Sequence, residues 1–418
     1  MHISILERLK NKEEWLAFFE HKERCGNLSI DERGDLFTFI ENGEYLPIAD
    51  DILNNGCFSP PQKVLLNKSN TDKKRTVYVY RREENYVLKL IAYMLSEYDG
   101  IFSPNLYSFR KNNGVKNAIN DILKLDGISG YYAYKLDISD YFNSVDIEKL
   151  LPMLENALAN DPALYSFLRS VLEYPYALYN DEPTYQKRGI MAGVPVSGFL
   201  ADLYLSELDA YFFDRGIPYA RYSDDIIVFA KNENELEACI SYIKSVLDEK
   251  GLKINSKKES VSQPYTEWTF LGFSYNNGEI DICRASVEKL KRKMRRKSRA
   301  LCRWADKNNV DRIKACRVFI RCFNRKLFDN PRSNELTWTR WFFPVISTDR
   351  SLHQIDLYMQ DCIRYIATGK RNKSRFEFRY GDMKEQGYVS LVNKYYKNDQ
   401  SVSLQNEKMQ KYNVAEEI

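Results

Sequence analysis

Residues 218–229 read PYARYSDDIIVF, so two adjacent acids, Asp224 and Asp225, stand between two apolar runs. Successive side chains of a strand point to opposite faces and Asp is uncommon in strands, so adjacent acids fit poorly inside one. The turn at a hairpin tip removes both restrictions. The pattern therefore predicts a β-hairpin over residues 219–230 with the acids at its tip, although an isolated pair of this kind is more often an ordinary Asp turn.

A further acid, Asp137, ends the apolar segment 131–136, which reads YYAYKL. If this segment is a strand beside the hairpin, Asp137 and Asp224 can jointly hold Mg²⁺, a hard cation that takes oxygen ligands and bridges substrate phosphates. Two such ions about 3.5–4 Å apart would clamp the attacking and leaving oxygens of a phosphoryl transfer and relieve the repulsion between the carboxylates. The acids together therefore indicate phosphoryl-transfer chemistry.

Three segments, in this order along the chain, resemble catalytic motifs of reverse transcriptases. Asp137 with Phe142 five positions later resembles their first acidic motif. Gly193-Val194-Pro195-Val196-Ser197 resembles a segment that contacts template and nucleotide in retron and related bacterial enzymes, and Tyr222-Ser223-Asp224-Asp225 resembles the YxDD box. Together these motifs are far more specific than any one of them.

Flanking segments extend the resemblance over roughly residues 75–300. Residues 103–110 (SPNLYSFR) resemble the fingers motif, residues 251–258 (GLKINSKK) a palm motif that ends in Lys, and residues 270–273 (FLGF) the primer-grip hairpin. The resemblance implies a right-hand polymerase of the α+β class, with fingers, a palm built on an antiparallel sheet, and a helical thumb.

The same resemblance implies a catalytic site with two Mg²⁺ ions. Asp137 and Asp224 are the expected principal ligands, Asp225 completes the acidic site, and the backbone carbonyl of Ile138 contributes. A primer 3′-hydroxyl would attack the α-phosphate of a dNTP, with positioning and electrostatic stabilisation supplying most of the acceleration. No side-chain nucleophile is required.

Basic side chains are expected on the triphosphate of the incoming dNTP. Arg110 matches the Arg of the fingers motif, and Arg is suited to bidentate phosphate contacts. One of Lys73, Lys74 and Arg75 is expected beside it, and we take Lys74. Lys258 is expected to assist proton transfer to pyrophosphate.

Two aromatic residues are expected at the nucleotide and the primer. Phe142 stands where reverse transcriptases carry the ring that blocks a ribose 2′-hydroxyl, which favours dNTPs. An RNA-dependent RNA polymerase would need a polar group there to accept that hydroxyl. Tyr222 is expected near the primer end.

The middle motif departs from the common pattern of the family at two positions. Ala192, expected with Gly193 in the nucleotide pocket, replaces a Gln found in many relatives. Ser197, expected to contact nucleic acid, is followed by Gly198 rather than Pro. The second variation resembles bacterial defence and abortive-infection branches more than intron enzymes.

A basic helix is predicted over residues 284–303. This segment has ten basic residues and one acid, a local charge of +9 in a chain whose net charge is only +4. Val287, Leu290, Met294 and Leu301 form its apolar stripe. It stands where a polymerase thumb grips the duplex backbone, and the expected contacts are Lys289, Arg292, Lys293, Arg295, Arg296, Arg299 and Arg303.

The C-terminal region resembles the extension of defence-associated reverse transcriptases. Its cationic residues are Arg364, Lys370, Arg371, Lys373, Arg375 and Arg379. Three tyrosines either stack on unpaired RNA bases or pack within a helical bundle, and the sequence leaves both interpretations open. They are Tyr388, Tyr395 and Tyr396.

Composition excludes several other classes of protein. The chain has eight cysteines without a CxxC pair and only three histidines, so it lacks the ligand spacing typical of zinc sites. No run of 18 apolar residues and no secretory leader is apparent, so we do not expect a membrane span. We expect a cytoplasmic location. The expected organisation is an N-terminal extension (1–75), fingers and palm (76–283), a basic thumb (284–330) and an RNA-binding extension (331–418).

The sequence thus predicts Mg²⁺-dependent copying of a structured non-coding RNA into DNA, with an RNA–DNA duplex and dNTPs as partners and a role in antiphage defence. Two alternatives stay open. One is template-independent or protein-primed synthesis of the abortive-infection type, which Ala192 allows. The other is a maturase-like RNA-binding protein.

Overall fold

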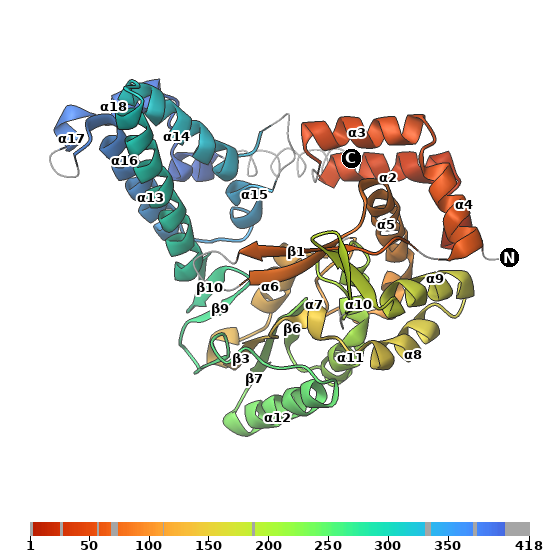
Figure 1. Cartoon of the computed structure of the whole chain (residues 1–418). Coiled ribbons are helices and arrows are strands. Elements are labelled where there is room, and N and C mark those ends of the chain that lie inside the picture. The colour runs from red at the N-terminus through yellow and green to blue at the C-terminus, as the bar shows by residue number, and fades with distance from the viewer. Residues whose placement is uncertain are drawn as a thin grey trace, which may run out of the picture. The chain divides into compact units, whose positions relative to one another are not determined.

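The computed structural model describes residues 3–25, 28–56, 58–67, 74–111, 113–185, 189–330, 336–370 and 374–397. The chain divides into two compact units, residues 1–266 and residues 267–418, whose elements are labelled in Figure 1. Three cationic residues singled out from the sequence lie outside the described residues: Lys73, a candidate for the triphosphate, and Arg371 and Lys373 of the C-terminal region.

The first unit begins with four helices that pack on one another. They are α1 (Ile5–Arg8), α2 (Lys12–Cys25), α3 (Ile30–Glu41) and α4 (Tyr45–Asn55). The carboxylate of Asp161, which caps the N-terminus of α9 (Pro162–Glu173), also accepts hydrogen bonds from Ser4 Oγ and from the backbone N–H of Ile5. One buried acid therefore fastens α1 to a helix about 155 residues away in sequence.

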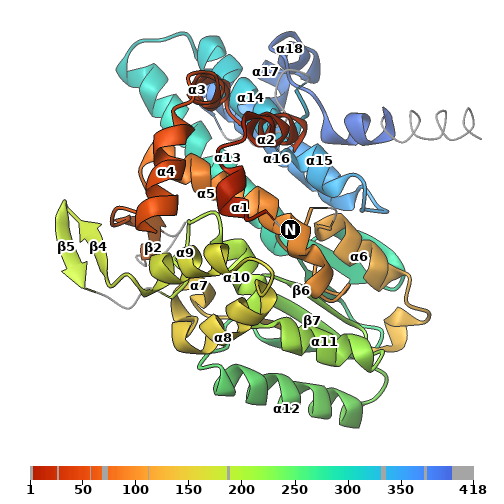
Figure 2. The ribbon, with the colours of Figure 1, turned by 90° about the vertical axis from the view of Figure 1, so that its right-hand side faces the viewer.

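A four-stranded sheet of order β2-β1-β4-β5 follows. Its strands are β1 (Gln62–Asn67), β2 (Lys74–Val79), β4 (Tyr176–Tyr179) and β5 (Glu182–Tyr185). Figure 2 shows the β4–β5 hairpin extending outward, and β4 is the neighbour of β1 in this sheet. The expected domain boundary after residue 75 falls inside β2. Because β1 and β2 pair antiparallel along their whole length, both strands belong to the same sheet and no boundary separates them there.

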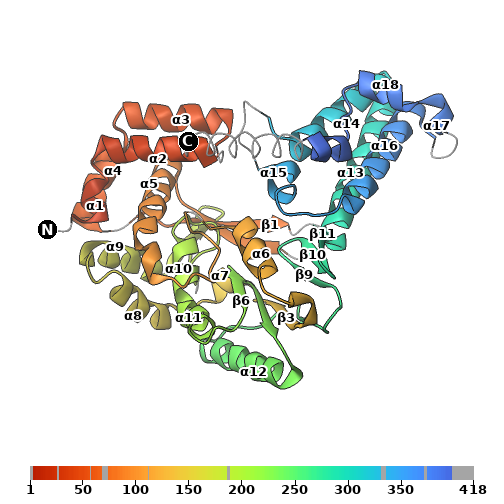
Figure 3. The same cartoon turned by 180° about the vertical axis from the view of Figure 1, so that it is seen from behind.

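The palm sheet has the order β6-β7-β3-β8 and is antiparallel throughout. Its strands are β3 (Tyr132–Asp137), β6 (Tyr219–Tyr222), β7 (Asp225–Ala230) and β8 (Ser260–Ser262). The hairpin predicted over residues 219–230 is confirmed. Helix α12 (Glu233–Glu249) packs on β3 and β7, and Figure 3 shows it running along the sheet.

The remaining helices of this unit surround the palm and enclose its core. They are α5 (Arg82–Met94), α6 (Val115–Leu123), α7 (Tyr141–Ser144), α8 (Ile147–Ala157), α10 (Ser197–Tyr204) and α11 (Ser206–Asp214), with the 3₁₀ helices η1 (Leu95–Ile101) and η2 (Ile128–Gly130). Every residue of α10 is buried, so this helix forms the centre of the core.

The second unit joins a small sheet to a helical bundle. The sheet has the order β11-β10-β9 and the bundle centres on α13, α14 and α16. Its elements are β9 (Trp268–Phe270), β10 (Phe273–Asn276), β11 (Glu279–Ile282), α13 (Arg284–Lys307), α14 (Arg312–Leu327), α15 (Trp338–Phe342), α16 (Arg350–Thr368), α17 (Ser374–Glu377) and α18 (Tyr380–Glu385). The expected FLGF segment belongs to this unit, since Phe273 packs edge-on against Phe342.

These elements confirm the α+β right-hand polymerase class, with an antiparallel palm sheet and helices dominating the second unit. The apolar stripe predicted for α13 is buried, and Ser298, Cys302 and Ala305 extend it. None of the helices in the described part of the chain has the length and apolarity needed to cross a membrane.

Asp356 of α16 ties the end of the described chain to the bundle. Its buried carboxylate accepts hydrogen bonds from the Tyr388 hydroxyl (3.0 Å) and the Ser390 hydroxyl (2.7 Å). It also accepts from the backbone N–H groups of Leu391 (2.9 Å) and Val392 (3.1 Å). Tyr388 is therefore a packing residue rather than a base-stacking surface.

We expect Asp356→Ala to lower the free energy of unfolding of the second unit by about 2–4 kcal/mol, because four donors lose their acceptor and two of them, the Tyr388 hydroxyl and the Leu391 N–H, are buried. Urea unfolding followed by tryptophan fluorescence measures the loss. Asp306→Ala, which removes an exposed carboxylate paired with Arg312, is the matched control and should cost less than about 1 kcal/mol. Equal losses in the two variants would contradict this assignment.

Candidate active site

Strand register brings the three acids to one end of the palm sheet. In the β3–β7 pair Asp137 lies directly opposite Asp225, and in the β6–β7 pair Tyr222 lies opposite Asp225. The turn between β6 and β7 consists of Ser223, whose φ is +60°, and Asp224. Three carboxylates that are separated by up to 88 positions in sequence thus meet at a single hairpin tip.

Asp137 is buried and its carboxylate has two partners from the segment after α12. Asn255 Nδ2 donates to Oδ1 at 2.9 Å, and Lys258 Nζ donates to Oδ2 in an ion pair. The backbone N–H of Asn255 also donates to the Asp137 carbonyl. Lys258 therefore lies in the acidic site, as expected. Asn255 was missed because only the Lys that ends the motif of residues 251–258 was singled out from the sequence.

Burial, together with the charge of neighbouring carboxylates, raises the pKa of Asp224 and of Asp225. Burial raises the pKa of Asp224 and the charge of Asp137 adds to it, while the charges of Lys258 and Arg75 oppose it. Burial, followed by the charges of Asp224 and Asp137, raises the pKa of Asp225 to about 6. For Lys258, burial lowers the pKa, but the hydrogen bond and charge of Asp137 outweigh it and the net shift is upward.

The donor set fits hard divalent cations. Within the described residues, no three His, Cys, Asp or Glu side chains form a complete ion-binding group by themselves. Mg²⁺ is usually held by one or two carboxylates together with substrate phosphates, so a site completed by a dNTP does not need such a group. Asp137, Asp224 and Asp225 supply the oxygens, and Ile138, whose N–H donates to the Asp224 carbonyl, stays a predicted carbonyl ligand.

A buried polar network supports the acidic turn from below. The Ser223 N–H donates to Ser108 Oγ at 2.9 Å, and Ser108 Oγ donates to Asp202 Oδ1 at 2.6 Å. Arg221, which is fully buried, donates through Nε to Asp209 Oδ1 at 2.8 Å and through a terminal nitrogen to the Asp202 carbonyl at 2.9 Å. Sequence analysis missed this network because its members come from three separate segments.

The segment of residues 192–197, expected in the nucleotide pocket, is held by its backbone against strand β2 of the β2-β1-β4-β5 sheet. Tyr78 N–H of β2 donates to the Ala192 carbonyl at 2.8 Å, so the departure at Ala192 leaves a backbone contact in place. Gly193 has φ +101°, and a Cβ there would stand 3.0 Å from the Tyr78 carbonyl oxygen. Ser197 is buried and its hydroxyl donates to the carbonyl of Met191, so its expected contact with nucleic acid stays a prediction.

Phe142 lies beside the same motif. The Phe142 carbonyl accepts from the Ile190 N–H at 2.8 Å, and its ring meets Phe109 edge-on at 6.1 Å. Phe109 in turn covers Gly198, where a Cβ would stand 2.7 Å from the Phe109 ring. The unusual Gly at this position therefore makes room for an aromatic neighbour of the proposed 2′-hydroxyl barrier.

The structure distinguishes among the basic residues expected on the triphosphate. Arg75 acts electrostatically on Asp224, whereas Lys74, one position earlier on β2, points to the opposite face of the strand. Arg110 is mostly buried and donates to the carbonyls of Ser103 and Asp99 at 3.0 and 2.9 Å. Arg75 is therefore favoured over Lys74, and the nucleotide contact of Arg110 stays a prediction.

Residues 66–275, half of the chain, match the family model described as reverse transcriptase (RNA-dependent DNA polymerase). The chain belongs to the reverse transcriptase family. The enzyme class expected from the sequence, RNA-directed DNA polymerase, and the resemblance to bacterial enzymes are thereby confirmed. This reverse transcriptase is 25% identical over 238 residues to the Retron Ec86 reverse transcriptase of Escherichia coli, a match covering 55% of this chain and 67% of that protein.

Two solved telomerase structures are similar at a TM-score of 0.43. The apo telomerase from Candida tropicalis, truncated from its C-terminal domain, is 17% identical, with 54% of this chain and 55% of that chain covered. The telomerase from Candida albicans in complex with the TWJ fragment of telomeric RNA is 14% identical, with 78% of this chain and 62% of that chain covered. The reverse transcriptase thus spans under two thirds of each telomerase chain.

The cations expected on the thumb lie on α13, all on its exposed surface. Basic residues of α14 form a further cationic face that the sequence analysis did not single out. The two helices approach each other at Lys293, whose pKa is lowered by burial and then by the charges of Lys289 and Lys326. The α14 residues are Arg312, Lys314, Arg317, Arg321, Arg325 and Lys326.

We expect Ser108→Ala to slow synthesis, because the Ser223 N–H and Asp202 lose the hydroxyl that joins them beneath the acidic turn. A fall in kcat of about 5- to 30-fold, corresponding to about 1–2 kcal/mol, is predicted with little change in the KM for dNTP. Steady-state kinetics on a primed template measure both. Ser245→Ala, on exposed α12, is the control, and an unchanged kcat for Ser108→Ala would refute the role.

Asp225→Asn should stabilise the metal-free protein while abolishing synthesis. Asp225 has a higher pKa in the folded than in the unfolded chain, so its contribution to stability falls as the pH rises from about 4 to above 6. At pH 7.5 the variant should gain about 2–3 kcal/mol. The gain should shrink as the pH is lowered through 6 and disappear below about pH 4.

Urea unfolding in EDTA at pH 7.5, 6 and 4 measures this difference. Asp248→Asn, at an exposed position of α12, controls for loss of a carboxylate and should show no such pH dependence. A gain that is constant over the pH range, or a loss at pH 7.5, would contradict the raised pKa of Asp225.

Proposed function

We propose that this reverse transcriptase copies a bound structured non-coding RNA into DNA by two-metal nucleotidyl transfer. The single observation that carries the proposal is the register that sets Asp137 opposite Asp225 with Asp224 in the adjoining turn. Two Mg²⁺ ions held by these carboxylates would supply charge stabilisation and orient the reacting oxygens. Substrates are a primer 3′-hydroxyl and a dNTP.

The chain's own residues account for the remaining requirements of this chemistry. Arg75 is a cation whose charge acts on the acidic site, which suits a triphosphate partner. Phe142, braced by Phe109, would face the sugar of the incoming nucleotide and disfavour a 2′-hydroxyl. Lys258 is held at Asp137 with its side chain 56% exposed, so it can release that carboxylate when cations arrive and meet the departing pyrophosphate.

The dedicated RNA template and the antiphage role rest on narrower support. The Ser197-Gly198 pair, explained structurally by the ring of Phe109, is the feature that favours the bacterial defence branch. The cationic faces of α13 and α14 suit a nucleic-acid partner. Cytoplasmic location follows from this role and belongs to the same proposal.

We would purify the full chain with its co-purifying RNA, add Mg²⁺ and dNTPs, and sequence any DNA product. Product complementary to one bound RNA, and absent with the Asp224→Ala, Asp225→Ala variant, is the expected result. Product of untemplated sequence would instead support the abortive-infection type of synthesis. Bound RNA without synthesis across varied primers would support the maturase-like alternative.

The same double variant separates the biological role from the chemistry. Cells expressing the wild-type chain with its native flanking RNA locus should reduce phage plating at least about 100-fold, and cells expressing the variant should not. Equal plating with both proteins, while synthesis occurs in vitro, would overturn the defence role and leave the polymerase assignment intact.

A further inference from the structure

Helix α13 carries two basic edges that face different neighbours. At 100° per residue, Lys289, Lys293 and Lys297 lie on one side of the buried stripe, and Arg295 and Arg299 lie on the other. The first edge approaches α14, as the interaction of Lys293 with Lys326 shows. The second edge turns toward α16, so a single role in gripping a duplex does not account for both.

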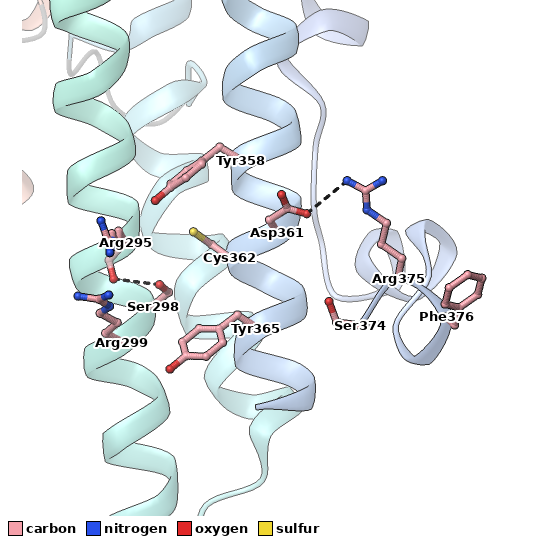
Figure 4. Close-up of a pocket in the computed structure, with 10 residues that line it drawn as sticks. All are labelled: Arg295, Ser298, Arg299, Tyr358, Asp361, Cys362, Tyr365, Ser374, Arg375 and Phe376. Carbon is pink, nitrogen blue, oxygen red and sulfur yellow. Dashed lines mark hydrogen bonds and ion pairs between the residues drawn. The ribbon is translucent and has the colours of Figure 1, made fainter. Parts of the chain in front are cut away.

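Arg295 and Arg299 line a cavity of about 720 Å³ between α13, α16 and α17. In Figure 4, Tyr358 and Tyr365 extend from α16 toward these two arginines, with Cys362 between the tyrosines. Ser298 of α13 also lines the cavity, and α17 closes one side with Arg375. The lining therefore combines guanidinium groups with aromatic rings inside one unit of the chain.

The net charge of the cavity depends on which of its charged side chains form ion pairs. Asp361, the one carboxylate in the lining, forms ion pairs with Arg364 at 3.2 Å and with Arg375 at 3.9 Å. Its negative charge is therefore balanced by arginines other than Arg295 and Arg299. Within the described ranges, neither Arg295 nor Arg299 forms an ion pair. Two guanidinium groups thus face the cavity and Tyr358 without an acidic partner, which leaves a net positive site.

This combination selects a class of ligand. Guanidinium groups donate bidentate, charge-assisted hydrogen bonds to phosphate, and aromatic rings stack on unpaired bases. A duplex hides its base faces, so it offers the phosphates but not the bases. The volume also suits a group of nucleotide size rather than a helix.

We propose that the α13–α16–α17 cavity binds an unpaired nucleotide of a single-stranded RNA segment, with its phosphate on Arg295 and Arg299 and its base against Tyr358. The cavity thus anchors a single-stranded part of the RNA partner at a place separate from the α14-facing edge of α13. The inference extends the proposed RNA partnership, but it concerns binding alone and does not depend on DNA synthesis.

The test compares the two edges of α13 in the full-length protein. Fluorescence anisotropy would follow an unstructured, labelled 12-nucleotide RNA and an RNA–DNA duplex of the same length, without dNTPs. Arg295→Gln, Arg299→Gln should weaken binding of the single strand at least about 10-fold and of the duplex less than about 3-fold, and should reduce the salt slope for the single strand by about 1. The matched pair Lys289→Gln, Lys293→Gln removes the same charge from the other edge and should weaken duplex binding more.

An aromatic substitution tests the stacking half of the proposal. Tyr358→Leu should weaken single-strand binding about 5- to 100-fold, whereas Tyr358→Phe should retain it. Unchanged melting temperatures would show that these surface variants are folded. Equal losses for both probes with both charge pairs, or no loss with Tyr358→Leu, would overturn the proposal.

A mononucleotide competitor separates an RNA segment from a free nucleotide. AMP at millimolar concentration should displace the labelled RNA only weakly, because one nucleotide lacks the neighbouring phosphates. Displacement by micromolar AMP would assign the cavity to a free nucleotide and overturn the RNA assignment. Neither result depends on whether the enzyme copies a template, so failure here leaves the proposed polymerase function untouched.

Discussion

The buried ion pair between Arg221 and Asp209 is the interaction on which the catalytic end of the palm depends. Both side chains are completely inaccessible, and their closest atoms are 2.5 Å apart. Burying either charge alone would cost several kcal/mol, so the pair persists only if the surrounding segments keep both partners in place. Tyr219 and Asn105 complete the arrangement by donating hydrogen bonds to Asp209.

This requirement links three segments that lie far apart in sequence. The backbone of Arg221 exchanges hydrogen bonds with the fingers-motif segment, accepting from the Tyr107 N–H and donating to the Asn105 carbonyl. Asp202 and Asp209 come from α10 and α11, directly after the nucleotide-pocket motif. The turn with Ser223 and Asp224 therefore cannot move without disturbing the segments that are expected to receive the nucleotide.

The acidic site, unlike the buried network beneath it, has more negative than positive charge. Beneath the turn, each buried charge has a partner, whereas at its tip three carboxylates share one principal cation, Lys258. Such a site destabilises the protein without ligands and gains when cations bind. The paired charges beneath the turn thus stabilise the fold around a site whose carboxylates repel one another until cations and substrates bind.

Short-range patterns in the sequence were sufficient for the main elements of this protein. The adjacent acids between apolar runs predicted the hairpin, and helical periodicity predicted the buried stripe of α13, because turn chemistry and residue period act over a few positions. The assignment of Asp137 and Phe142 to a catalytic motif came instead from their resemblance to reverse transcriptases. Only the tertiary structure decided which distant groups meet. It paired Asn255 with Asp137, favoured Arg75 over Lys74, buried the Ser197 hydroxyl, and placed Arg295 and Arg299 opposite tyrosines of α16. Those contacts depend on strand register and helix packing across many tens of residues, and no local spacing encodes them.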